Sequence, residues 1–154
     1  MDCGEGMDCS DLELPDAQLE LLKALKETGK TVIAVVICGR PLVLTQVCEL
    51  ADGVILGFYP GPRGGQAIAE VISGRVAPSG RLPVSLPRST GQVPVYYNYK
   101  NSYRAMTYMD GEAGPLFPFG YGLGYGTFEW GACSLSTERC NVAALENKGL
   151  TIRF

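Results

Sequence analysis

The segment Thr31–Cys38, TVIAVVIC, is apolar at almost every position and rich in β-branched side chains. Such residues favour strands, and a strand that is apolar at successive rather than alternate positions is covered on both faces. Strands of this kind occur mainly in parallel sheets with helices packed on each side. Gly39 and Pro41 follow the run and end it. The segment therefore predicts a layered α/β fold.

The neighbouring segments alternate between helix and strand patterns. A helix is expected from Pro15 to about Glu27, because Pro fits the first helical turn and leucines recur at helical spacing, with Gly29 ending it. A short helix, a second buried strand and a third helix are predicted over Thr45–Ala51, Gly53–Phe58 and Gln66–Ser73. This order predicts part of a three-layer α/β/α sandwich with a mostly parallel sheet.

The pattern changes after Val76, where prolines interrupt short strand-like pieces such as Arg81–Leu86. The tyrosine-rich stretch Tyr96–Tyr108 is expected to form extended loops. Beyond Gly126, two further strands are predicted at Thr127–Trp130 and Leu150–Phe154. We therefore expect an α/β domain over residues 1–126 and an incomplete β-sandwich over residues 127–154.

Composition excludes several classes of function. The chain is 46% hydrophobic and 19% charged, with a net charge of −3, so we expect a folded protein that does not bind nucleic acid. No apolar run is long enough to span a membrane. The absence of histidine excludes Ser-His-Asp triads and histidine-containing zinc sites. The six cysteines form no CxxC pair, so no metal or cofactor is expected. Their pattern favours a reducing, cytoplasmic compartment, and export stays open.

A glycine-rich loop, Gly61–Gly65, precedes the third predicted helix. Backbone amides at a helix start can hold a phosphate group. The glycine spacing, however, matches neither the GxGxxG fingerprint nor the P-loop. A structural turn is favoured, and a flavodoxin-like nucleotide binder is a disfavoured alternative.

Seven short segments, in this order, carry a resemblance to a known family. They are Gly4–Asp8 with Leu12–Pro15, Gly39–Leu42, Tyr59–Gly61 with Gly64–Ala69, Pro78–Pro83, Pro87–Asn98, Pro115–Leu123, and Tyr125 with Thr127–Phe128. Together they resemble the C-terminal α/β domain of family 3 glycoside hydrolases, the β-glucosidase and β-xylosidase family. The resemblance covers about residues 4–130. The residues after Phe128 are similar to the start of the fibronectin-type-III-like domain that many members carry.

The resemblance implies a retaining glycoside hydrolase that cleaves oligosaccharides or aryl and alkyl glycosides. In that family an N-terminal barrel supplies an aspartate nucleophile, and the α/β domain supplies a glutamate that acts as general acid and base. Such carboxyls lie about 5 Å apart. The chain is thus expected to be a fragment, inactive without the barrel as its partner.

Glu5 is the candidate acid/base, because some members carry the glutamate in a similar Gly-Glu-Gly before an Asp-Arg pair. In other members it lies further upstream, so the alternative that Glu5 is an ordinary surface residue stays open. The sequence departs from the family at Cys9, where an arginine is usual, and at Pro62-Arg63, where Gln-Glu is frequent.

A second interpretation is a non-catalytic α/β module that binds sugar or a partner through Tyr96–Tyr108. Tyrosine rings stack on sugar rings, although tyrosines in loops more often pack against their own chain. Hydrolysis of a chromogenic glucoside by the full-length gene product separates this interpretation from the enzyme.

Overall fold

The computed structural model describes residues 4–100 and 108–153. The chain divides into two compact units, Met1–Gly124 and Tyr125–Phe154. The first unit contains α1, β1, α2, β2, α3 and η1, and the second contains β3, α4 and β4.

Helix α1 (Asp16–Glu27) follows Pro15, which stands at its N-cap. Pro at this position loses nothing, because the first amides of a helix have no intrahelical acceptor. The helix ends at Thr28, and Gly29 adopts a φ of 69°, a left-handed conformation that glycine reaches without strain. Leu19 and Leu22 are its buried residues. The predicted first helix is therefore confirmed.

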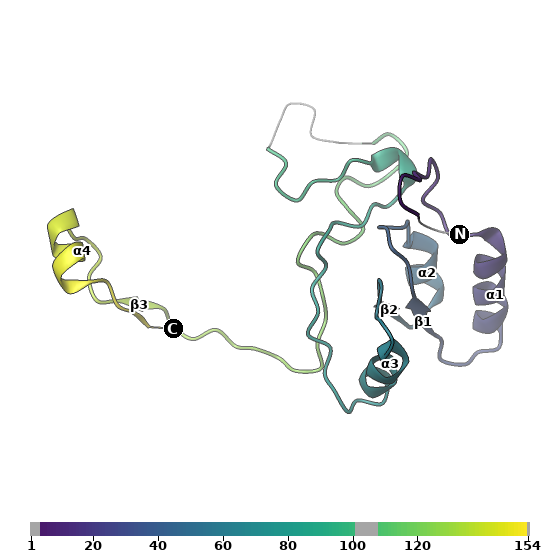
Figure 1. The fold of residues 1–154 in the computed structure, drawn as a ribbon, viewed down its shortest axis with the longest axis horizontal. Helices are drawn as coiled ribbons and strands as arrows, with labels where there is room; N and C mark the ends of the chain where they lie inside the picture. Colours follow the sequence, from purple (N-terminus) through teal and green to yellow (C-terminus); the bar gives the residue numbers. More distant parts are fainter. Residues whose placement is uncertain (1–3, 101–107, 154) are drawn as a thin grey trace. The chain divides into compact units, whose positions relative to one another are not determined.

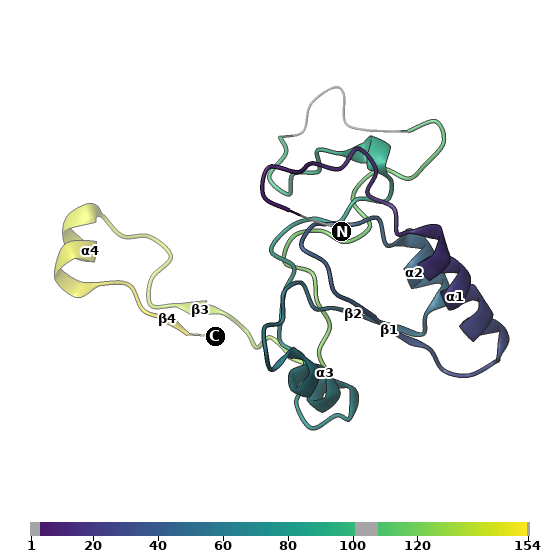
Figure 2. The same cartoon turned by 45° about the vertical axis from the view of Figure 1, so that its right-hand side comes forward.

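Strands β1 (Ile33–Val36) and β2 (Gly53–Leu56) pair in parallel, with Ile33 opposite Gly53 and Val36 opposite Leu56. Helix α2 (Thr45–Leu50) connects them. Figures 1 and 2 show α1 and α2 beside this small sheet, with α1 on the β1 side of the pair. The α/β class and the parallel sheet predicted from the sequence are confirmed.

The hydrophobic core lies between α1, α2 and one face of the sheet. Its buried members are Leu19, Leu22, Val36, Cys38, Leu44, Val47 and Leu86. Helix α3 (Gly64–Ile72) comes near the sheet at Gly57, the residue that follows β2. A Cβ built on Gly57 would lie 2.7 Å from the Ile37 side chain and 4.0 Å from Ile68 of α3.

Burial on both faces, expected for Thr31–Cys38, is wrong for the described residues. Val36 and Cys38 are buried, whereas Ile33, Val35 and Ile37, which alternate with them, are exposed. The physical reason is that α1 and α2 cover only one face of the sheet. Helix α3 comes near the sheet only at Gly57, beyond the end of β2.

Two extended segments run side by side after α3, as Figures 1 and 2 show. The amide of Leu82 donates to Tyr121 O and that of Leu86 to Phe117 O, both at 2.8 Å. Arg81 also donates to the carbonyl of Gly122. The strand-like piece predicted at Arg81–Leu86 is thus an extended segment with one isolated bridge, Leu86 to Phe117. A short 3-10 helix, η1 (Thr90–Gln92), follows it.

The second unit holds a two-residue antiparallel pair, β3 (Ser134–Leu135) with β4 (Ile152–Arg153). Helix α4 (Val142–Lys148), absent from the sequence prediction, lies between them in the chain, and the Asn141 side chain caps it. Strand β4 falls within the strand predicted at Leu150–Phe154, of which Phe154 lies outside the described residues.

The strand predicted at Thr127–Trp130 is wrong, because these residues form no ladder. Phe128 and Trp130 are 87% and 86% exposed. Alternating side chains do not hold a strand in water without a partner strand. Among the helices of the described residues, none has the length and hydropathy needed to cross a membrane.

Candidate functional site

Glu5 lies in a tight turn formed by Gly4–Met7. The amide of Met7 donates to Gly4 O at 3.2 Å, and Gly6 adopts a φ of 69°. A left-handed residue at the third position of a turn favours glycine, so the turn itself accounts for Gly6. Glu5 is exposed, and within the described parts of the chain its carboxylate has no hydrogen bond or ion pair. The turn therefore projects a carboxylate toward solvent.

Arg40, in the loop after β1, forms a hydrogen bond to this turn. Its Nη2 donates to Met7 O at 3.2 Å, across 33 positions of sequence. The Nε atom of Arg40 is buried and has no hydrogen-bond partner within the described residues. Arg40 belongs to one of the seven segments that resemble the family, but the sequence alone predicted no role for it. The signal was its place directly after a buried strand.

The segment after the turn is fixed at Leu12. Its amide donates to Thr90 Oγ1 at 3.1 Å, and its carbonyl accepts from the amide of Val43 at 2.9 Å. Thr90 in turn donates to Asp11 Oδ1 at 3.4 Å. These bonds hold the N-terminal segment against the loop after β1 and against η1.

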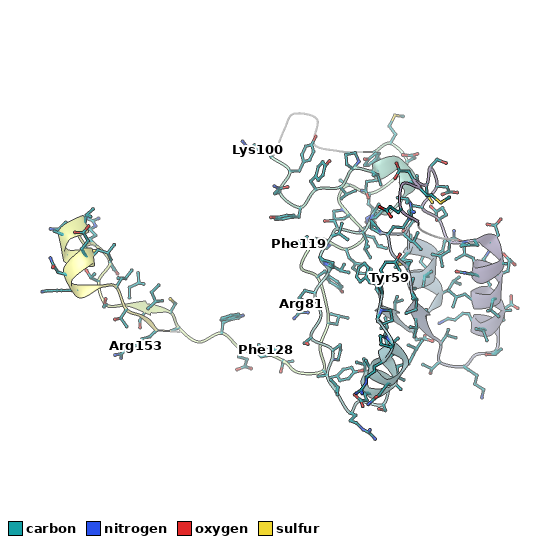
Figure 3. All side chains as sticks on the ribbon, viewed as in Figure 1. Tyr59, Arg81, Lys100, Phe119, Phe128 and Arg153 are labelled. Carbon is teal, nitrogen blue, oxygen red and sulfur yellow. The ribbon has the colours of Figure 1, made fainter. Side chains whose placement is uncertain are left out.

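The Glu5 turn is thus held by residues that come after the carboxyl end of β1. In open α/β sheets, ligands bind outside the carboxyl ends of the strands. The loop after β2 meets the same region: a Cβ on Gly39 would lie 2.0 Å from Tyr59 Oη, so Gly39 lets this ring approach the backbone. Figure 3 labels Tyr59, which is exposed.

The glycine-rich loop folds as a turn. Gly64 donates to Gly61 O at 3.1 Å, and α3 starts at Gly64. A Cβ on Gly64 would lie 2.5 Å from the Pro60 ring, so this glycine serves close packing. The bond between Gly61 and Gly64 occupies an amide that a phosphate would need. The loop geometry favours the structural interpretation over nucleotide binding.

Aromatic rings gather on the loop residues after η1. Tyr97 stacks on Phe119 with ring centroids 4.4 Å apart, and Tyr96 stacks on Tyr99 at 6.3 Å. All four side chains are exposed; Phe119 is labelled in Figure 3. Tyr103, also in the tyrosine-rich stretch, lies outside the described residues. The rings pack on one another and still offer exposed aromatic surface.

A cavity of about 530 Å³ lies between α1 and β1. Its walls are mostly apolar, with Asp11, Glu13 and Arg40 among the polar residues at its lining. Burial, together with the neighbouring carboxylate of Asp11, raises the pKa of Glu13. Glu5 is not among the described lining residues. Within residues 4–100 and 108–153, no group of three or more Cys, Asp or Glu residues is placed to hold a metal ion.

Comparison with protein families matches residues 1–125 to the glycosyl hydrolase family 3 C-terminal domain. The chain is 42% identical over 138 residues to a periplasmic β-glucosidase of Salmonella typhimurium, a match covering 83% of this chain and 18% of that protein. It is 44% identical over 145 residues to a β-xylosidase of Formosa agariphila, covering 92% of this chain and 20% of that one.

Solved structures give the same relationship. A Listeria innocua β-glucosidase in complex with laminaribiose aligns at a TM-score of 0.79 and 35% identity, over 87% of this chain and 20% of that one. A β-glucosidase from Erythrobacter marinus aligns at 0.78 and 45% identity, over 84% of this chain and 17% of that one. The chain therefore spans a minor part of the length of the relatives it matches.

Proposed function

Because the chain belongs to the family of glycosyl hydrolase family 3 C-terminal domains, we propose that it is the α/β part of a retaining, β-glucosidase-like enzyme. The substrate class is an oligosaccharide or an aryl or alkyl glycoside, and the bond cleaved is O-glycosidic. Residues 127–154 are proposed to begin a fibronectin-type-III-like domain.

The observation that carries the proposal is the exposed Glu5 turn, anchored through Arg40 to the loop after β1. Glu5 is proposed as the general acid/base. In the first step its carboxyl protonates the leaving glycosidic oxygen while a nucleophilic carboxylate attacks the anomeric carbon and forms a glycosyl-enzyme ester. In the second step the Glu5 carboxylate removes a proton from a water that attacks the same carbon, which breaks the ester bond and releases the nucleophilic carboxylate.

The nucleophile belongs to the barrel domain implied by the family. Retention requires two carboxyls about 5 Å apart, and the first step cannot proceed without the nucleophile. We therefore expect the 154-residue chain alone to show no turnover.

The experiment compares the chain alone with a chimera of the Salmonella typhimurium periplasmic β-glucosidase, in which the 138 matched residues are replaced by those of this chain. Release of nitrophenol from p-nitrophenyl β-D-glucoside by the chimera, and none from the chain, is the expected result. A folded chimera that hydrolyses neither aryl β-glucosides nor aryl β-xylosides would overturn the proposed activity.

A second candidate, a non-catalytic sugar-binding module, is favoured by the exposed stacked pair Tyr97–Phe119. Titration of the chain alone with laminaribiose tests it. Binding that is lost in Tyr97→Ala but kept in Glu5→Gln would favour the module. Hydrolysis by the chimera that depends on Glu5 would favour the enzyme.

A further inference from the structure

Tyr59, in the loop after β2, is exposed although its backbone is tightly constrained. Its side chain is 70% exposed. Phe58, the residue before it, is half-buried and adopts a φ of 47°, a left-handed conformation that is strained for a bulky side chain. Pro60, the residue after it, restricts the backbone of Tyr59 to extended conformations. The loop therefore turns Phe58 partly inward and holds the ring of Tyr59 at the surface.

Contacts on both sides of this position keep the loop in one shape. The amide of Gly57 donates to Val36 O at 2.8 Å, next to the last residue pair of the sheet. On the other side, a Cβ built on Gly64 would lie 2.5 Å from the ring of Pro60, so the loop packs closely on the start of α3. An aromatic ring on a fixed loop loses little conformational entropy when it binds a ligand.

The ring of Tyr59 (Figure 3) reaches the loop that follows β1. A Cβ built on Gly39 would lie 2.0 Å from Tyr59 Oη and 2.4 Å from its Cζ, so a larger residue than glycine would displace the ring. Arg40, next in sequence, donates through Nη2 to Met7 O at 3.2 Å, and Met7 closes the turn that carries Glu5. The Tyr59 ring and the Glu5 turn therefore contact the same two-residue segment.

The proposed chemistry determines which part of a substrate lies on this side. A general acid must lie within hydrogen-bond reach of the glycosidic oxygen that it protonates. The nucleophile attacks the anomeric carbon from the face opposite this oxygen, so groups beside the acid/base are near the leaving group. An exposed tyrosine ring offers a flat apolar face, on which an aryl or sugar ring covers more area than a small alkyl group does.

We propose that Tyr59 is a specificity-determining residue whose ring stacks on the leaving group of the substrate. It favours glycosides whose leaving group is itself a ring, aryl or glycosyl, over those with a small alkyl group. The inference rests on the proposed function and narrows its substrate class. Stacking uses the face of the ring, so the hydroxyl group of Tyr59 is not required.

The test uses the same chimera and two glucosides whose leaving groups have similar acidity, phenyl and hexafluoroisopropyl. Tyr59→Ala is expected to lower kcat/KM for the phenyl glucoside by about 5- to 10-fold relative to the hexafluoroisopropyl glucoside. Tyr59→Phe is expected to keep the ratio of the parent. Tyr125→Ala, which removes another exposed tyrosine, is the matched control and is expected to keep it too.

A second readout separates contact with the leaving group from a structural role. In the second step the leaving group has departed, so Tyr59→Ala is expected to leave the hydrolysis of a trapped 2-deoxy-2-fluoroglucosyl enzyme by water unchanged. Transfer of the same glucosyl group to an added phenyl glucoside is expected to slow by about 5- to 10-fold, because this acceptor must bind where the leaving group was. A structural role would slow both reactions.

Binding of phenyl and ethyl 1-thio-β-D-glucosides, measured by calorimetry, keeps the test independent of turnover. A preference for the phenyl compound that Tyr59→Ala removes, in a folded chimera without hydrolysis, would reject the proposed function and keep the role of Tyr59. Hydrolysis with the same phenyl to hexafluoroisopropyl ratio in parent and Tyr59→Ala would do the opposite. Binding of neither compound would overturn both.

A side chain from the rest of the enzyme that covers Tyr59 is the competing occupant of this surface. In that case Tyr59→Ala would lower the melting temperature of the chimera and slow both glucosides equally, which would overturn the proposal. If the chimera does not fold, the chain is co-expressed with the remaining part of the Salmonella protein, and the same variants and substrates are compared.

Discussion

Glu5 is the residue on which the proposed chemistry depends, and its surroundings are simple. It stands in a four-residue turn whose closing bond and left-handed Gly6 are local, while its position depends on the bond from Arg40 to Met7. The carboxylate is free of protein partners within the described residues. A general acid or base must lie within hydrogen-bond reach of the group whose proton it transfers, so the proposed role requires the glycosidic oxygen to lie directly beside this carboxylate.

In the chimera, Glu5→Ala is expected to slow substrates with poor leaving groups by about 100-fold or more and to spare those with good ones, which need little protonation. Azide is expected to restore the rate, because a small anion fits the space of the missing carboxylate. Comparison of alkyl and dinitrophenyl glucosides gives the measurement, with Glu13→Ala as a control carboxylate. If Glu5→Ala lowers the hydrolysis rates of all substrates equally, or leaves all of them unchanged, the acid/base lies elsewhere in the polypeptide.

Gly64 and Gly65 are adjacent at the start of α3 but have different surroundings. A Cβ on Gly64 would lie 2.5 Å from the rigid Pro60 ring, whereas one on Gly65 meets nothing within 4 Å. Gly64→Ala is expected to destabilise the chain by about 1–3 kcal/mol through overpacking. Gly65→Ala is expected to be neutral or to stabilise by about 0.5–1 kcal/mol. Urea unfolding of both variants measures this, and equal midpoints would show that the Pro60 ring gives way.

The elements of the first unit were largely predictable because their signals are local. The leucine spacing of α1 and the β-branched run of β1 depend on neighbours in sequence, and both elements formed where expected. The exposure of Ile33 and Val35 was not predicted, because an apolar run indicates a strand but does not indicate which of its two faces the helices cover. The strand predicted at Thr127–Trp130 is wrong because alternating apolar and polar residues do not supply the partner strand that a ladder needs.

The hydrogen bonds that hold the segment after Glu5 could not be predicted from the sequence. Leu12 bonds to Thr90 across 78 positions, and no periodicity connects a hydroxyl in a 3-10 helix with an amide so far away. The family resemblance indicated that both segments matter without indicating that they touch. Glu5 stays a prediction from the resemblance, and the bonds of Arg40 and Thr90 that hold its segment were not predicted.

Thr90 gives an element-level prediction. Thr90→Val keeps the shape of the side chain but removes the acceptor for the Leu12 amide, so we expect a loss of about 1–2 kcal/mol and faster proteolysis before Leu14. Ser89→Ala is the matched control, because Ser89 is exposed and its side chain makes none of these bonds. Limited proteolysis with mass spectrometry measures the cleavage. Identical cleavage of the two variants would mean that the Val43 bond alone holds the segment.

At the scale of the whole molecule, the two units differ in how much they bury. The first has a core of seven buried hydrophobic residues, whereas the second exposes Trp130, Leu135, Val142 and Ile152. A pair of two-residue strands and one short helix do not bury enough apolar surface to be stable alone in water. Exposed strand edges with apolar side chains promote association between molecules.

A chain that ends at Phe128 is therefore expected to stay monomeric at concentrations where the 154-residue chain aggregates. Light scattering over a concentration series measures the difference. Hydrogen exchange in residues 135–153 of the longer chain is expected to be near the rate of unfolded peptides. Equal solubility of the two chains, combined with slow exchange in that segment, would show that the second unit folds alone.

The bonds between Leu86 and the Leu116–Phe117 segment have a consequence for how this domain can diversify. Leu86 donates to Phe117 and accepts from Leu116, so the chain that leaves the core at Leu86 returns to it beside its point of departure. A loop whose ends are joined in this way can change length cheaply, since each doubling costs only about 0.6 kcal/mol of closure entropy. Length changes confined to the residues after η1 keep the bond from Leu12 to Thr90 and the bond from Thr45 of α2 to Arg88 in place. Evolution can alter the tyrosine-bearing surface here without redesigning the fold that carries it.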